Sequence, residues 1–76
     1  MDNQNYKTAF RRRLRQLRAE KGVGSTKVSE LCGLAGCAVY KYEAGAWVPN
    51  AKSLCALADY FDCSVDYLLG RSESRK

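Results

Sequence analysis

Arginines are concentrated near the beginning of the chain, where their side chains could bind anions. Five of them occur between residues 11 and 18, namely Arg11, Arg12, Arg13, Arg15 and Arg18. A guanidinium group stays charged and pairs with phosphate or carboxylate oxygens through parallel hydrogen bonds. A helix would spread these side chains over more than one face, so part of the run would be plain solvated surface. The rest would contact phosphates at the flank of a nucleic-acid site, with an affinity that falls as salt rises.

Cysteine is the other residue type with reactive chemistry, but its spacing does not favour a metal or catalytic site. Cys32, Cys37, Cys55 and Cys63 include no C-x-x-C pair, and the chain has no histidine. The usual partner base of a nucleophile and a common ligand of zinc are therefore missing. We expect no enzymatic activity, no metal, no cofactor and no small-molecule ligand. The cysteines are interpreted as small apolar residues in or near a core, with a disulfide or a zinc site as less favoured alternatives.

Length and composition limit the protein class and its partners. The chain has 76 residues, 46% of them hydrophobic, which suits one small globular domain. A formal net charge of +5 favours an anionic partner such as nucleic acid or a membrane surface. The N-terminal residues lack the apolar region of a secretory signal, and no apolar stretch approaches the roughly 18 residues that span a bilayer. We therefore expect a cytoplasmic protein with no membrane partner.

The charge is distributed unevenly along the chain. Residues 7–41 hold nine basic and two acidic residues, whereas residues 42–70 hold one basic and four acidic residues. Residues 7–41 are therefore predicted to form a side of the molecule that faces an anion. Residues 42–70 are predicted to form the side that supports it.

Apolar periodicity and helix-ending glycines predict five short helices. The predicted helices cover about residues 6–21, 25–32, 36–44, 51–61 and 65–69, with Asn50 and Ser64 as N-caps of the last two. We divide the chain into a lead (1–9), a helical domain (10–70) and a polar tail (71–76) that we expect to fray. The predicted core consists of Leu14, Leu17, Val28, Leu31, Leu34, Val39, Leu54, Leu57, Phe61, Val65, Leu68 and Leu69.

The second and third predicted helices carry the pattern of a helix-turn-helix. Counting from Ser25, the fifth residue is Ser29, the ninth is Gly33 and the fifteenth is Val39. The fifth must be small because the two helices pack there, and the ninth must turn with a positive φ. The fifteenth must be apolar to anchor the second helix. That helix would then be held outward for the major groove of DNA.

Three segments make the chain resemble the Cro/cI-like (Xre-type) helix-turn-helix repressor family over about residues 13–70. They are Arg13-Leu-Arg-x-Leu-Arg18, Tyr42-Glu43-x-Gly45 with Pro49 behind it, and Ser64-Val-Asp-Tyr-Leu-Leu-Gly70. The resemblance implies an all-α, compact five-helix lambda-repressor-like domain, with the helix at about 36–44 in the major groove. It also implies a transcriptional regulator, a repressor of bacterial or phage origin, that binds double-stranded operator DNA as a homodimer.

The resemblance implies roles for individual residues. Arg18 would form a structural ion pair with Glu43 and have a second role at a phosphate. On the helix-turn-helix, the expected DNA-binding residues are Ser25, Thr26, Lys27, Gly36, Cys37, Tyr40 and Lys41. The arginine run adds Arg11 and Arg15 to this set. The expected dimer interface is Trp47, Val48, Pro49 and Tyr67, and the alternative for Trp47 is a side chain folded back onto the core.

The base-contacting positions depart from the pattern of that family. The stretch Ala35-Gly36-Cys37-Ala38 has no side chain able to form two hydrogen bonds with a purine. Lys41 is the one long donor left there, and Tyr40 could stack or donate its hydroxyl. One hypothesis is a DNA-binding regulator that depends on phosphate contacts, groove shape and Lys41. The other is a protein-interaction module on the same fold with weak or non-specific DNA binding.

Overall fold

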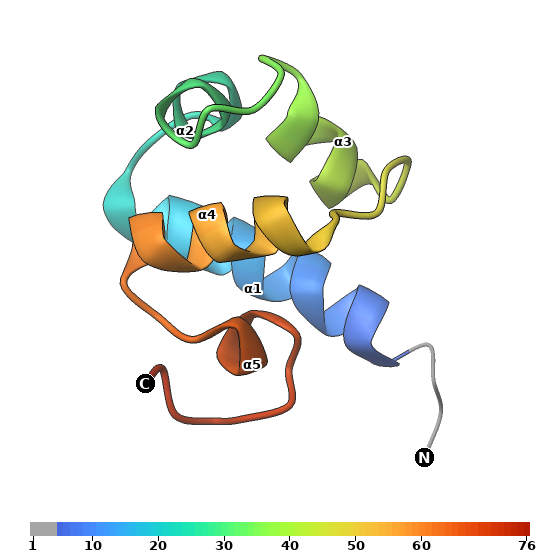
Figure 1. The fold of residues 1–76 in the computed structure, drawn as a ribbon, viewed down its shortest axis with the longest axis vertical. Coiled ribbons are helices and arrows are strands. Elements are labelled where there is room, and N and C mark those ends of the chain that lie inside the picture. Colours follow the sequence, from blue (N-terminus) through green and yellow to red (C-terminus); the bar gives the residue numbers. More distant parts are fainter. Residues whose placement is uncertain (1–4) are drawn as a thin grey trace.

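Five helices make up the secondary structure of residues 5–76, the part of the chain that the computed structural model describes (Figure 1). They are α1 (Asn5–Lys21), α2 (Ser25–Leu31), α3 (Ala38–Ala44), α4 (Ala51–Phe61) and α5 (Val65–Leu68). In Figure 1, α2 and α3 lie on one side of α1 and α4, and α5 lies on the other. Residues 5–76 contain no strand, so the predicted all-α class is confirmed. None of the described helices is long and apolar enough to cross a bilayer.

Side-chain caps begin the last two helices where the sequence predicted them. The Oδ1 atom of Asn50 accepts a hydrogen bond from the Ser53 amide at 2.8 Å. The Oγ atom of Ser64 accepts one from the Tyr67 amide at 3.0 Å. Each cap satisfies an amide that has no carbonyl partner within its helix, which fixes where α4 and α5 start.

The turn between α2 and α3 depends on Gly33 and Ser29. Gly33 has a φ of +72°, which a residue with a Cβ atom rarely adopts. Ser29 is fully buried, and its hydroxyl accepts a hydrogen bond from the Val39 amide at 2.9 Å. The same hydroxyl donates to the Ser25 carbonyl at 2.9 Å. The small residue predicted at this position therefore also joins α3 to α2 by a buried hydrogen bond.

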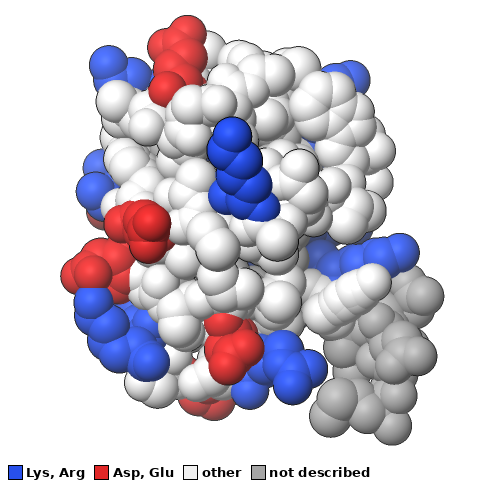
Figure 2. Space-filling model, in the orientation of Figure 1, with Lys and Arg blue, Asp and Glu red and all other residues white. Residues whose placement is uncertain are grey.

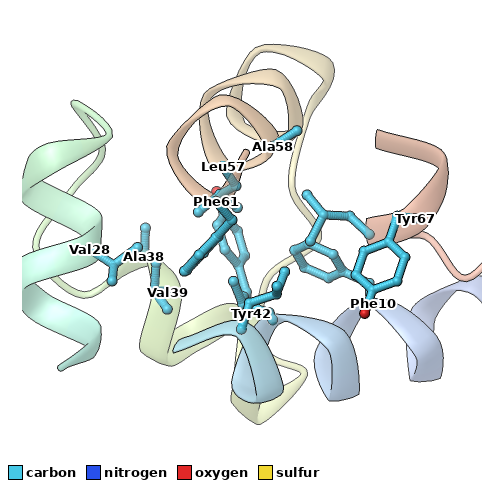
Figure 3. Packing of buried hydrophobic residues seen from close by; sticks show 12 residues of the cluster. Phe10, Val28, Ala38, Val39, Tyr42, Leu57, Ala58, Phe61 and Tyr67 are labelled. Atoms are coloured by element: carbon cyan, nitrogen blue, oxygen red, sulfur yellow. The ribbon is translucent and has the colours of Figure 1, made fainter. Parts of the chain in front are cut away.

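The core is one cluster to which all five helices contribute (Figure 3). Val28 and Val39 lie at its α2–α3 end, and Phe10 and Tyr67 lie at its α1–α5 end. Leu57 of α4 lies between them. The buried apolar residues are Phe10, Leu14, Leu17, Val28, Ala38, Val39, Tyr42, Leu57, Ala58, Phe61, Tyr67 and Leu68.

The predicted core was wrong at Leu31, whose side chain is 55% exposed. Leu31 is the last residue of α2, and the inward position at this end belongs to Cys32, whose Sγ lies 3.8 Å from the Ala56 carbonyl oxygen. Four other predicted core residues are only half-buried at the margin of the cluster: Leu34, Leu54, Val65 and Leu69.

The C-terminal tail packs against the domain, so the prediction that it frays was wrong. Figure 1 shows residues 71–76 returning past α5 toward the end of α4. The Ser64 amide donates to the Arg75 carbonyl at 2.6 Å. Arg75 Nη2 donates to both carboxylate oxygens of Glu20 at 2.9 Å, and the Lys76 ammonium pairs with Asp62. The tail is held because its cations meet carboxylates of α1 and of the α4–α5 turn.

Candidate nucleic-acid interface

Helix α3 presents one face to the core and the opposite face to solvent. Ala38, Val39, Tyr42 and Glu43 are buried. The outer face contains the positions spaced i, i+3, i+4 and i+7 from Cys37, as expected for a helix with one buried stripe. Of these, Cys37, Tyr40 and Ala44 are exposed and Lys41 is half-buried. The structure therefore brings Cys37, Tyr40 and Lys41 together on the surface that the sequence assigned to DNA.

The start of this helix differs from the prediction. α3 begins at Ala38, whereas a helix from Gly36 was expected. Gly36 and Cys37 instead form a turn, closed by a hydrogen bond from the Ala38 amide to the Ala35 carbonyl at 2.9 Å. Glycine is a poor helix former, and no side chain caps this end, so the helix starts later. Both residues stay exposed at the edge of the outer face.

The first turn of α2 supplies the other predicted contacts of the helix-turn-helix. Thr26 and Lys27 are exposed, and Ser25 is half-buried. Gly24 is the N-cap and offers no side-chain hydrogen bond. Any phosphate bound here would therefore depend on backbone amides, the Thr26 hydroxyl and the Lys27 ammonium.

Arg18 and Glu43, which the resemblance paired, form a two-point ion pair between α1 and α3. Arg18 Nε donates to Glu43 Oε2 at 2.7 Å, and Arg18 Nη2 donates to Oε1 at 2.8 Å. The Glu43 side chain is only 8% exposed, so its carboxylate is largely shielded from water, while the Arg18 side chain is 25% exposed. The hydrogen bonds that Arg18 donates to the Glu43 carboxylate raise the pKa of Arg18. Arg18 Nη1 also donates to the Val23 carbonyl at 3.2 Å, which fixes the position of the guanidinium.

Two further arginines of α1 surround the same glutamate. Arg11 Nε donates to the Glu43 carbonyl at 3.2 Å, and Arg15 Nε lies 3.6 Å from Glu43 Oε1. The Arg11 guanidinium also lies at the end of α3, with Cζ 3.2 Å from the place where a Cβ on Gly45 would be. A shallow groove of about 460 Å³ runs along this side, lined by Thr8, Arg11, Arg12, Arg15, Gln16, Ala19 and Glu43. One carboxylate thus faces several guanidinium groups, and the groove carries excess positive charge.

Comparison with known proteins agrees with this geometry. A family model described as a helix-turn-helix domain matches residues 9–69. The chain belongs to the Cro/cI-like (Xre-type) helix-turn-helix family. The match begins within α1 and continues through α5, so all five helices contribute to the family domain.

Several curated relatives are similar to this helix-turn-helix domain. The chain is 36% identical over 64 residues to the HTH-type transcriptional regulator AnsR of Bacillus subtilis, covering 84% of this chain and 55% of AnsR. It is 38% identical over 61 residues to the uncharacterized HTH-type transcriptional regulator YobD of Bacillus subtilis, covering 80% and 54%. It is 31% identical over 64 residues to the HTH-type transcriptional activator BcrR of Enterococcus faecalis, covering 84% and 31%. The chain thus spans about half or less of these relatives' lengths. No solved structure matches the chain.

Arg13 has a different environment from the other arginines of this helix-turn-helix domain. The residue is 9% exposed, and its guanidinium Cζ lies 4.0 Å from the centroid of the Tyr67 ring. Its Nη1 donates to the Tyr67 carbonyl at 2.9 Å and to the Ser72 carbonyl at 3.2 Å. Glu73 lies 3.5 Å from Nη2. Arg13 therefore binds α5 and the tail, and it is not part of the basic surface.

Sequence reasoning missed this role, although the chain contains a signal for it. Phe10, Leu14 and Leu17 define the buried stripe of α1. Position 13 completes the i, i+3, i+4, i+7 pattern with these three residues. An arginine inside an apolar stripe needs a specific polar partner, and the tail carbonyls provide it here.

The predicted dimer residues lie in two different environments. Trp47 is 43% exposed, and its ring packs edge-on against Tyr42 with the centroids 6.5 Å apart. Val48 is 69% exposed, and both residues border an apolar cavity of about 310 Å³ beside Phe10. Pro49 also borders this cavity and is half-buried. Tyr67 differs from the prediction, because it is 5% exposed and lies beneath the guanidinium of Arg13.

The four cysteines of this helix-turn-helix domain are all free. Cys37 and Cys55 are exposed, whereas Cys32 and Cys63 are half-buried. Burial raises the pKa of the Cys32 and Cys63 thiols, so both stay protonated at neutral pH. Within residues 5–76, no group of three or more His, Cys, Asp or Glu side chains is placed to hold a metal ion.

Proposed function

We propose that this chain binds double-stranded DNA and regulates transcription, with α3 in the major groove and arginines of α1 on flanking phosphates. The observation that carries the proposal is the position of Glu43. It is held by Arg18 on the inner side of α3, while Tyr40 and Lys41 face solvent on the outer side. A helix fixed in this way is pre-organised to enter a groove. The similarity to proteins named as transcriptional regulators, one of them an activator, supports the same function.

In this proposal, helix α1 binds the phosphates, and the loop after α3 does not. Ala44 at the end of α3, and Ala46 and Val48 in the loop after it, stand where the family resemblance leads one to expect asparagine or basic residues. Arg11 places its guanidinium at that end of α3, and Arg15 lies beside it. Each phosphate contact would contribute a slope of about −0.9 to the dependence of log affinity on log salt concentration.

Homodimerisation is a second part of the proposal. Trp47 and Val48 form an exposed apolar surface next to the 310 Å³ cavity, and such surfaces are typical of contacts with another subunit. A two-fold dimer would bury the same patch on both copies and present two copies of α3 to half-sites about one helical turn apart. Tyr67 is not part of this surface because it is buried. Sedimentation of the Trp47→Ala variant should show a monomer at concentrations where the unmodified chain is a dimer.

A DNA titration at two salt concentrations tests the main proposal. The chain is titrated with the upstream region of its own gene and with a scrambled duplex of equal composition. We expect tighter binding to the upstream region and a steep loss of affinity with added salt. No binding even at low salt would contradict the proposal. Repression is the expected direction, and a reporter under the same upstream region distinguishes it from activation.

Lys41 and Arg12 provide a matched pair of lysine and arginine substitutions for this titration. Lys41→Ala should reduce the preference for the upstream region, because Lys41 is the long donor on the outer face of α3. Arg12→Ala should weaken binding to both duplexes equally, because a phosphate contact carries no sequence information. An equal loss on both duplexes with Lys41→Ala would contradict a role in base contact.

Thiol alkylation tests the placement of Cys37. In a Cys55→Ser background, Cys37 is the exposed thiol, and the raised pKa values of Cys32 and Cys63 slow their reaction. Complete modification of Cys37 should abolish DNA binding by adding bulk at the groove surface. Unchanged affinity after modification would place Cys37 away from the DNA.

A protein-interaction module is the alternative function, and one observation favours it. Tyr40 is 62% exposed on α3 and Leu31 is 55% exposed at the end of α2, so the helix-turn-helix presents apolar side chains. Exposed aromatic residues are common anchors of protein interfaces. Failure of every duplex to bind at low salt would favour this alternative.

A further inference from the structure

The outer surface of α3 is mostly uncharged, although the proposed ligand is a polyanion. Gly36, Cys37 and Tyr40 are exposed there, and none of them carries a charge. Figure 2 shows mainly uncharged side chains over the part of the molecule where Figure 1 places α3. Lys41 is the cation of this helix, and it is half-buried at the edge of the surface.

The side chains of this surface limit what they can recognise in a major groove. Purines are usually identified by side chains that form two hydrogen bonds at once, such as Arg, Asn or Gln. Neither a glycine, a thiol nor a phenol can do this. The apolar group that the major groove offers is the C5-methyl group of thymine, and small or aromatic side chains contact it.

The geometry of the turn before α3 allows a close approach to such a methyl group. A Cβ placed on Gly36 would have no heavy atom within 4 Å, so nothing hinders access to the backbone there. Cys37 is the N-cap of α3, and Tyr40 lies one helical turn further on the same face. The buried hydrogen bond from Val39 to Ser29 holds this part of the helix in place.

We infer that Gly36, Cys37 and Tyr40 form a surface that recognises the C5-methyl groups of thymine, with Lys41 adding one polar contact at its edge. This inference rests on the proposed DNA binding and names the base feature that the same site would select. Burying one methyl group corresponds to about a four-fold change in affinity, so two or three methyl groups would give appreciable sequence preference without any hydrogen bond to a base.

Replacing thymidine by deoxyuridine tests the inference, because their bases, thymine and uracil, differ only by that methyl group. The 76-residue chain is first used to select duplexes from a pool of random 20-base-pair DNA made with thymine. The recovered duplexes are then resynthesised with deoxyuridine at the enriched positions. We expect affinity to fall about four-fold for each methyl group removed from the contacted positions. Deoxyuridine placed only in the flanks of the same duplexes should leave the affinity unchanged.

The outcomes separate this inference from the proposed function. Selected duplexes that bind equally well with deoxyuridine would overturn methyl recognition and leave DNA binding intact. A pool from which no duplex is recovered at low salt would overturn both. Variants add an independent readout: Cys37→Ser should reduce the thymine-to-deoxyuridine affinity ratio, and Cys55→Ser on α4 should not change it. Tyr40→Phe should keep the ratio, because the aromatic ring remains.

Discussion

Two faces of the same helix use arginine in opposite ways. On one face of α1, Arg11, Arg15 and Arg18 gather around the α3 residue Glu43, and two of the three remain exposed. On the other face, Arg13 is buried against the Tyr67 ring. The first group leaves guanidinium groups able to bind a further anion. On the second face, the guanidinium is already satisfied within the protein.

The position of each arginine relative to the apolar stripe explains this difference. The stripe contains Phe10, Leu14 and Leu17, and Arg13 falls within it at helical spacing. Arg11, Arg15 and Arg18 have the same spacing but are shifted by one residue, which rotates them about 100° around the helix axis. A shift of one residue therefore separates an arginine that stabilises the fold from arginines available for binding.

Arg13→Ala should have the largest effect on stability among the substitutions considered. It removes hydrogen bonds from a charged donor to two carbonyls and a cation–π contact with Tyr67. We expect a loss of about 2–4 kcal/mol in the free energy of unfolding, measured by urea denaturation. Arg12→Ala, at the exposed neighbour, should change it by less than about 0.5 kcal/mol. Similar values for both variants would contradict the division between the two faces.

Gly70→Ala tests the packing between α1 and the residue that directly precedes the tail. A Cβ on Gly70 would lie 2.4 Å from the Ala9 Cβ, and the residue has a φ of +76°. We expect a loss of about 2–3 kcal/mol from combined crowding and backbone strain. Gly33→Ala in the helix-turn-helix is the matched control, since its φ is +72° but no atom lies within 4 Å of its Cβ position. The control should cost about 1–2 kcal/mol from backbone strain alone, and an equal loss for both would show that α1 yields to the added methyl group.

Local sequence patterns predicted the helix-turn-helix better than they predicted the contacts of the C-terminal tail. Ser29, Gly33 and Val39 lie within 11 residues of one another in the sequence, and local turn and packing rules define their roles. The caps Asn50 and Ser64 are local for the same reason. These features were therefore predicted at the correct residues.

Apart from the start of α3, the features that were missed depend on contacts between distant parts of the chain. Arg13 meets a carbonyl 59 residues away, at Ser72, and neither residue indicates the other by local spacing. Leu31 became exposed because Cys32 occupies the inner position near α4. The approach of the tail to α1 and α5 decides whether Tyr67 is covered, and helical periodicity alone does not describe it.

Glu43→Gln tests how far the arginines of α1 around Glu43 depend on the charge of its carboxylate. The amide keeps the size of the side chain but loses the charge that Arg15 and Arg18 face at 3.6 and 2.7 Å. We expect a loss of about 1–2 kcal/mol in the free energy of unfolding. Non-specific DNA should bind more tightly, because one negative charge is removed beside the arginine groove. Arg15→Gln should have the opposite effect on DNA affinity and little effect on stability, and a stability loss equal to that of Glu43→Gln would contradict this assignment.

The pH dependence of the tail contacts is the smallest effect that we expect, and it tests the side of the molecule where Arg13 and the tail pack. The Arg75 guanidinium lowers the pKa of Glu20, and the Lys76 ammonium lowers the pKa of Asp62. A carboxyl with a lower pKa in the folded chain stabilises that state above its unfolded pKa, and this contribution is lost as pH falls through the folded value. The tail should therefore stay docked above the ordinary carboxyl range of about 4 and loosen only as pH falls below that range, through the lowered pKa values of Glu20 and Asp62. The amide signal of Ser64, which donates to the Arg75 carbonyl, reports this change in an NMR titration.

Glu20→Gln should weaken the transition and Glu30→Gln on α2 should leave it unchanged. A Ser64 signal that stays constant from pH 6 to pH 3 would show that these ion pairs do not hold the tail.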